Sequence, residues 1–180
     1  MIVDSSSSTA RKCGCGQYGC AEVYSSAKNM AIRMYEAEKR QKDCKTRNEV
    51  SDAEHIHDDD DDDDNDNDNN KEVIITGIDL SAQHVFERYL HSDPLAVKIM
   101  EETADYLSIL AINICRVVDP EIIIFSGGLA KAGDVFLTLV RDKMKHRTWT
   151  VLPTDVQLVI ARSIDNGGMV GAALAAKKLV

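Results

Sequence analysis

Three cysteines near the N-terminus have the residue type and the spacing to bind a metal ion. Cys13, Cys15 and Cys20 fall within eight residues, in the run Cys-Gly-Cys-Gly-Gln-Tyr-Gly-Cys-Ala-Glu. The glycines of this run let the backbone turn sharply enough to direct all three sulfurs at one point. We therefore predict a structural zinc knuckle rather than three unligated thiols, because a glycine-spaced cysteine cluster seldom arises by chance.

The fourth ligand of a tetrahedral zinc ion has to come from outside this cluster. The side chains that could supply it are Cys44, His55, His57, His84, His91 and His146. None of them stands next to the cysteines in sequence. A water molecule or an incomplete site is the alternative that we favour.

Glu22 stands two residues after the last cysteine, where a helix is predicted to begin. Apolar residues from Val23 to Met34 recur at helical spacing, so we expect an amphipathic helix to about residue 40. A glutamate near a helix start is usually placed favourably at the positive end of the helix dipole. That role is the alternative to any ligand contact by Glu22.

The formal net charge of −9 is concentrated in one segment. Nine aspartates lie between Asp58 and Asp68, so the rest of the chain sums to zero. Without a basic stripe, nucleic acid is not expected as a partner. No apolar run approaches the roughly 20 residues of a membrane span, and no signal peptide is evident. Together with a cysteine content typical of a reducing compartment, this predicts a cytoplasmic protein without a membrane partner.

The segment 41–71 ends in an Asp/Asn tract with no apolar residue after Ile56. A segment with so little to bury does not offset its ordering entropy, so we predict a disordered acidic insertion. His55 and His57 beside the aspartates suggest loose capture of divalent cations, but a solvated low-complexity segment is the favoured interpretation.

Two helices are expected next. Ser81 is a suitable cap for a short helix that ends at Leu90, and Asp93 followed by Pro94 is a strong start signal for a long one. The apolar stripe of the long helix widens toward its end. We therefore expect its C-terminal half to be buried nearly all round, with Cys115 in the core.

A strand, a glycine pair and a helix then follow in order. The β-branched run 122–125 is typical of a parallel strand covered on both faces, and Gly127 and Gly128 lead into a helix that is expected to end near His146. Glycines at such a turn either relieve crowding or let a nucleotide approach the backbone. A second strand at 156–160 and a last helix rich in Gly and Ala, suited to close packing, complete the α/β pattern.

The run from Cys13 to Glu22 resembles the zinc signature of the ROK family, which contains repressors and sugar kinases such as glucokinases and N-acetylhexosamine kinases. The stretches Asp-Pro-Glu-Ile-Ile-Ile-Phe-Ser-Gly-Gly (119–128) and Gly-Gly-Met-Val-Gly-Ala-Ala (167–173) resemble its C-terminal half, in the same order. The resemblance implies an α/β fragment of the actin-like, ribonuclease-H-like C-terminal domain. It also implies missing sheet strands and an exposed sheet edge, at which aggregation or homodimer formation is expected.

The resemblance also implies roles for individual residues. Glu22 would accept a hydrogen bond from a sugar hydroxyl, and the loop at Gly127 and Gly128 would lie against the adenosine and phosphates of ATP. In the family a Gly-Glu-x-Gly-His segment precedes the knuckle and its histidine ligates zinc. That histidine aligns immediately before Met1, so we expect this chain to lack it.

The implied reaction is transfer of the γ-phosphoryl group of ATP, with Mg²⁺, to a hexose such as glucose or an N-acetylhexosamine. The family's catalytic aspartate and first phosphate loop lie upstream of the part that this chain resembles. We therefore expect no kinase activity from the isolated chain, and no catalytic residue in it. The alternatives are an inactive sugar- and ATP-binding or regulatory module and a fragment of a ROK-type repressor. The expected parts are a knuckle and helix (1–40), the insertion (41–71) and the kinase C-terminal part (72–180).

Overall fold

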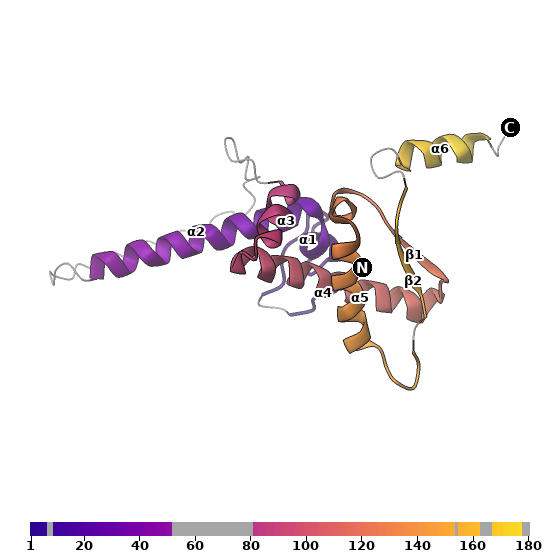
Figure 1. The fold of residues 1–180 in the computed structure, drawn as a ribbon, viewed down its shortest axis with the longest axis horizontal. Helices are drawn as coiled ribbons and strands as arrows, with labels where there is room; N and C mark the ends of the chain where they lie inside the picture. The colour runs from indigo at the N-terminus through magenta and orange to yellow at the C-terminus, as the bar shows by residue number, and fades with distance from the viewer. Residues whose placement is uncertain (7–8, 52–80, 154, 163–166, 178–180) are drawn as a thin grey trace.

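The computed structural model describes residues 1–6, 9–51, 81–153, 155–162 and 167–177, although the side chains of 45–51 are not considered. Helices and two parallel strands make it a mixed α/β fold, as expected (Figure 1). The elements are α1 (Ala21–Ser25), α2 (Ala27–Ser51), α3 (Ala82–Leu90), α4 (Pro94–Val118), β1 (Ile122–Phe125), the 3₁₀ helix η1 (Gly128–Ala132), α5 (Gly133–Arg147), β2 (Gln157–Ile160) and α6 (Gly167–Lys177).

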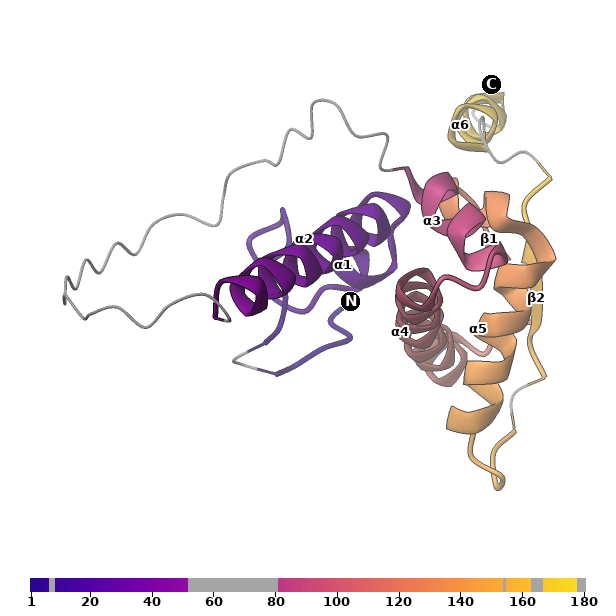
Figure 2. The same ribbon diagram turned by 60° about the vertical axis from the view of Figure 1, so that its left-hand side comes forward.

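Helix α4 is the centre of the packing. Figure 2 shows it between α1 and α2 on one side and α5 on the other, and α3 also contacts it. Its buried face carries Ile99, Met100 and Ala104, which join one core cluster with Met34 of α2 and Phe136 of α5. A second, smaller cluster of Cys13, Val23 and Tyr24 lies under the N-terminal segment. The knuckle thus has a hydrophobic support of its own.

The starts of α3 and α4 confirm the predicted caps. The Ser81 hydroxyl accepts a hydrogen bond from the backbone N–H of His84 (3.2 Å). The Asp93 carboxylate accepts from the amides of Leu95 and Ala96 at 2.9 and 3.0 Å, and Pro94 follows at the first helical position. These bonds satisfy helix donors that otherwise have no partner.

The expected helix after the knuckle is divided in two. Ser26 adopts an extended conformation (φ −86°, ψ 152°) between α1 and α2. Helix α2 then continues to Ser51, inside the range 41–71, and extends away from the rest of the fold (Figure 1). Most of that acidic range, with His55 and His57, lies outside the described residues, so the disordered insertion stays a prediction.

Strands β1 and β2 pair in parallel, with Ile122 opposite Gln157 and Phe125 opposite Ile160. The parallel sheet is therefore confirmed, but the expectation that β1 is covered on both faces is wrong. Ile122 and Ile124 are 46% and 63% exposed, whereas Ile123 and Phe125 pack toward the core. The described helices cover one face of the pair, and α5 is the one in contact with β2 (Figure 2).

The end of α4 and the last helix also differ from expectation. Cys115 is buried as predicted, but Val117 and Val118 are 82% and 68% exposed, so the C-terminal half of α4 is not buried all round. Every residue of α6 is exposed, so its small side chains make no close packing with the described part of the chain. None of the described helices combines the length and the apolar character needed to cross a membrane.

Candidate functional site

The knuckle is a tight loop held by backbone hydrogen bonds. The amide of Cys13 donates to the carbonyl of Gln17 (2.8 Å), and Lys12 and Tyr18 form an antiparallel bridge around it. Gly19 has φ +74°, and a Cβ at this position would lie 1.7 Å from the backbone oxygen of Asp4. Only glycine fits there, because the N-terminal strand passes directly over it.

The three cysteine sulfurs converge as predicted. The Sγ atoms of Cys13, Cys15 and Cys20 all lie within 4.8 Å of one another, and Cys15 and Cys20 are 3.6 Å apart. A tetrahedral zinc ion with Zn–S bonds of about 2.3 Å places its sulfurs about 3.8 Å apart. The cluster therefore has the dimensions of a zinc site, and zinc bound there would have a structural role.

The three thiols influence one another's protonation. The hydrogen bond with Cys15 raises the pKa of Cys20 to about 11. The backbone N–H of Gln17 is the main group that lowers the pKa of Cys15. A second thiolate beside the first is disfavoured by their mutual repulsion, which a bound divalent cation would offset.

The fourth ligand remains open. Among the described residues, no further His, Cys, Asp or Glu has a ligand atom close to all three sulfurs. His84, His91, His146 and Cys44 belong to the described part of the chain and are not in the group. The alternatives of water or an incomplete site remain predictions.

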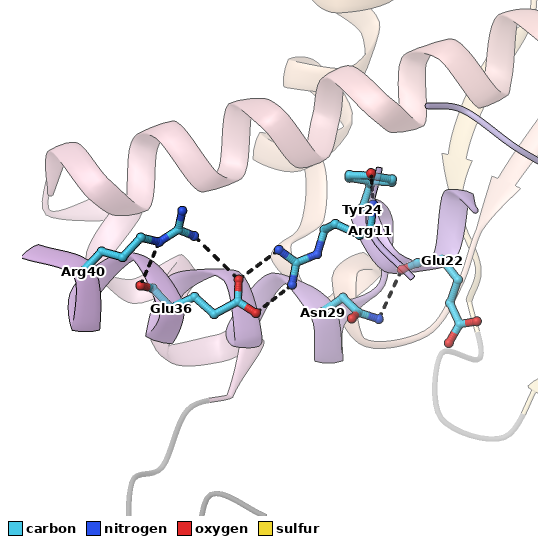
Figure 3. A network of polar contacts seen from close by, with 6 residues as sticks. All are labelled: Arg11, Glu22, Tyr24, Asn29, Glu36 and Arg40. Carbon is cyan, nitrogen blue, oxygen red and sulfur yellow. Dashed lines mark hydrogen bonds and ion pairs between the residues drawn. The ribbon is translucent and has the colours of Figure 1, made fainter. Parts of the chain in front are cut away.

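Glu22 lies in the first turn of α1, exposed, beside the knuckle. The Cys13 thiol donates to its Oε2 across 3.6 Å. Figure 3 shows its carboxylate pointing away from the network around Arg11 and Glu36. The carboxylate is thus held next to the cysteines and open to a ligand.

The junction between α1 and α2 is fixed by the backbone oxygen of Glu22. It accepts hydrogen bonds from the Ser26 amide (3.0 Å) and from Nδ2 of Asn29 (3.3 Å; Figure 3). Nδ2 of Asn29 also contacts the Ser26 hydroxyl at 2.8 Å. The break between α1 and α2 therefore has a defined geometry.

The glycine loop after β1 lies against this junction. A Cβ on Gly128 would approach the Cβ of Ala27 to 2.7 Å, and Gly127 has φ +85° with open space beside it. Gly167 lies near the Ser126 hydroxyl, which is 3.9 Å from its ideal Cβ position. Both glycine pairs thus follow the carboxyl ends of the parallel strands, where ligands of open α/β sheets bind.

A largely apolar cavity of ≈ 550 Å³ adjoins the loop and opens between α2, α3 and η1. Phe86 and Leu90 of α3 and Leu129 of η1 line it together with Gly128. Sequence reasoning did not identify this cavity. The sequence predicted only the cap and the end of α3, because the η1 segment that completes the cavity is distant in sequence.

Gly128→Ala is expected to destabilise the fold by about 1 to 3 kcal/mol, because the new methyl group overlaps Ala27. Urea unfolding measures this change. Gly171→Ala is the matched control, since nothing lies within 4 Å of a Cβ at that helical position. It should be neutral or slightly stabilising. Equal stability of the Gly128→Ala variant and the parent would contradict the observed packing.

A family model supplies the decisive comparison, because the ROK family matches residues 2–179. The chain belongs to the ROK family. The resemblance of the knuckle and of the two glycine stretches is therefore confirmed as family membership across nearly the whole chain.

Three ROK relatives show the range of the family. The chain is 27% identical to an N-acetyl-D-glucosamine kinase of Escherichia coli O6:H1 over 165 residues. This alignment covers 91% of the chain and 41% of the kinase. The structure of a ROK glucokinase from Streptomyces griseus in complex with glucose and AMPPNP matches the chain with a TM-score of 0.63 at 22% identity. The match covers 94% of the chain and 48% of the glucokinase. A ROK transcriptional regulator, described as a homologue of the E. coli MLC protein, matches with a TM-score of 0.60 at 21% identity. This match covers 98% of the chain and 37% of the regulator.

The chain spans less than half of the length of each of these relatives. The two solved structures are similar enough to show the shared fold. Because a glucokinase and a transcriptional regulator share this fold, the fold alone does not decide whether the chain has a catalytic or a regulatory role.

Proposed function

We propose that the chain is the C-terminal part of an ATP-dependent hexose kinase of the ROK family. One observation carries the proposal: Gly128 packs on Ala27, so the glycine loop lies at the helix junction that begins at Glu22. In this proposal the Glu22 carboxylate, which is suited to sugar hydroxyls, and the glycine loop, which is suited to phosphates, belong to one site. The kinases among the relatives support a hexose substrate, with glucose or N-acetylglucosamine as the candidates.

In this proposal each group has a separate task. The Glu22 carboxylate accepts a hydrogen bond from a sugar hydroxyl. The backbone around Gly127 and Gly128 faces the phosphates of ATP and its Mg²⁺, and the apolar cavity beside Leu129 offers room for the adenine base. Zinc held by the three cysteines stiffens the loop that positions Glu22.

Asp119 is not placed to act as the general base for the sugar hydroxyl at this site. Asp119 caps the end of α4 with φ +48°, before β1, whereas the glycine loop follows β1. A strand of this length separates the two by about 13 Å. Asp79 lies outside the described residues.

The isolated chain is therefore expected to bind AMPPNP with saturation but to form no hexose phosphate from ATP, Mg²⁺ and either sugar. Absence of a general base alone costs about 10² to 10⁴ in rate, and loss of substrate positioning adds about 7 to 11 kcal/mol to the barrier. Coupled hexose-phosphate detection and calorimetry measure the two outcomes. Hexose phosphorylation by a preparation free of contaminating kinase would contradict the proposal that this chain holds only part of the active site. Absence of AMPPNP binding would contradict the proposed role of the loop at Gly127 and Gly128.

An inactive sugar- and ATP-binding module is the second candidate, favoured by the position of Asp119 away from the glycine loop. The two candidates differ once the chain is joined to a partner or extension that supplies an aspartate. A kinase part should then gain activity, and a binding module should not. A repressor function is supported only by the shared fold of the MLC-like regulator.

A further inference from the structure

A second cavity lies between α2 and α4, apart from the proposed kinase site. Its volume is ≈ 650 Å³, and the N-terminal segment closes one end. Tyr24 and Tyr106, stacked with ring centroids 4.1 Å apart, form part of its wall. Figure 3 shows Tyr24 and Glu22 pointing in different directions from α1. The cavity is therefore a different site from the one that Glu22 faces.

Positive charge is in excess around this cavity. Four cationic side chains line it: Arg11, Arg33, Arg40 and Lys98. Three carboxylates line it: Asp4, Glu102 and Asp105. Asp105 is already engaged by Arg147, whose Nη2 lies 2.5 Å from Oδ2. Arg33 pairs with Glu102, and Glu36 beside the cavity pairs with both Arg11 and Arg40, so Lys98 is the one lining cation without an ion pair among the described residues.

Two of the cations share one carboxylate. Arg11 binds Glu36 with two parallel hydrogen bonds of 2.9 and 2.8 Å, and Arg40 approaches the same carboxylate at 3.7 Å (Figure 3). The side chain of Arg40 is 75% exposed, so it can turn to another anion at small cost. Lys98 is exposed at the opposite wall, on α4.

Arg33 is the buried cation of the set. It is 6% exposed, and its Nε has no hydrogen-bond partner among the described residues. Nη1 lies 3.2 Å from Glu102, and Nη2 donates to the Tyr24 carbonyl (2.8 Å) and to the Thr103 hydroxyl. Burial lowers the pKa of Arg33, and the positive charge of Arg11 lowers it further, against the opposite effect of Glu102. Its charge is thus only partly compensated.

We propose that this cavity binds a small oxyanion, the phosphate or carboxylate group of a metabolite, between Arg40 of α2 and Lys98 of α4. Such a group would accept charge-assisted hydrogen bonds from both walls and offset the excess charge near Arg33. The volume leaves room for a small organic body beside the stacked tyrosines.

A ligand in this cavity would contact residues that also hold the knuckle. Arg11 and Asp4 line the cavity and also hold the knuckle, since the Gly19 amide donates to the Arg11 carbonyl (2.9 Å) and the Asp4 amide donates to the Gly19 carbonyl (3.2 Å). The Tyr24 hydroxyl links them by donating to Asp4 and accepting from the Arg11 amide. The cavity and the knuckle that precedes Glu22 therefore share three wall residues, Asp4, Arg11 and Tyr24.

The test is calorimetric titration of the full chain at constant ionic strength with inorganic phosphate, glucose 6-phosphate and citrate. At least one should bind with saturation, and the preferred probe distinguishes a phosphate from a carboxylate ligand. The double variant Arg40→Ala/Lys98→Ala should bind that probe about tenfold or more weakly. Lys39→Ala, an exposed cation on α2 outside the cavity lining, is the matched control and should change affinity less than about twofold.

Glu22→Gln should leave anion binding unchanged, which separates this site from the sugar site. The altered side chains are exposed or at the cavity mouth, so circular dichroism should show an intact fold. The proposal is overturned if no probe saturates, or if the double variant and Lys39→Ala weaken binding equally.

Discussion

Cys13→Ser is expected to remove zinc from a protein that otherwise purifies with about one zinc ion per chain. The three sulfurs already lie at nearly the separations that a tetrahedral ion imposes, so metal binding needs little rearrangement. A serine hydroxyl is not deprotonated as a thiol is, and it is a poor zinc ligand. Apparent zinc binding energies of about 10 to 16 kcal/mol in small zinc domains show how much stability depends on such a site.

Metal analysis of reduced, folded protein measures this effect, together with thermal unfolding before and after chelation. Cys44→Ser is the matched control, because Cys44 is exposed on α2 and lies outside the cysteine group. It should retain the zinc content of the parent. A parent protein without zinc, or a Cys13→Ser variant that keeps it, would remove the physical basis of the predicted knuckle.

Gly19→Ala is expected to lower the free energy of unfolding of the N-terminal region by about 3 to 4 kcal/mol. A side chain at φ +74° costs about 1 to 2 kcal/mol, and the new Cβ would lie 1.7 Å from the Asp4 oxygen. The N-terminal segment must then move away. The two hydrogen bonds from the amides of Val3 and Asp4 to the Gly19 carbonyl, at 2.8 and 3.2 Å, are lost at about 1 kcal/mol each.

Gly14→Ala is the control for this prediction. It lies in the same loop, but nothing is within 4 Å of a Cβ there, so the change should cost less than about 1 kcal/mol. Limited proteolysis and urea unfolding compare the two variants. If both alanine variants are equally stable, the N-terminal strand does not pack over the knuckle as described.

Local signals in the sequence predicted the parts of the fold that depend on neighbouring residues. Ser81 and Asp93 cap their helices because the donors that they satisfy are two or three residues away. The convergence of the cysteines follows from their short glycine spacing in the same way. The β-branched run 122–125 likewise forms a parallel strand.

Features that depend on distant partners could not be predicted. The exposure of Ile124 and Val117 depends on which elements cover them, and a hydrophobic pattern records only the capacity to be buried. The contact of Gly128 with Ala27 joins segments about a hundred residues apart. Neither local spacing nor composition marks such a pair, and the same holds for the cavity beside Arg33.

Calorimetric titration of the zinc-loaded chain with glucose and with N-acetylglucosamine tests the central proposal most directly. At least one sugar should bind with saturation, and Glu22→Gln should weaken it by about 10- to 100-fold, the effect of losing a charged hydrogen-bond acceptor worth about 1.5 to 3 kcal/mol. Glu121→Gln, at an exposed position at the far end of β1, should leave sugar affinity unchanged. Sugar binding that is unaffected by Glu22→Gln, or absent from the parent chain, would contradict the account.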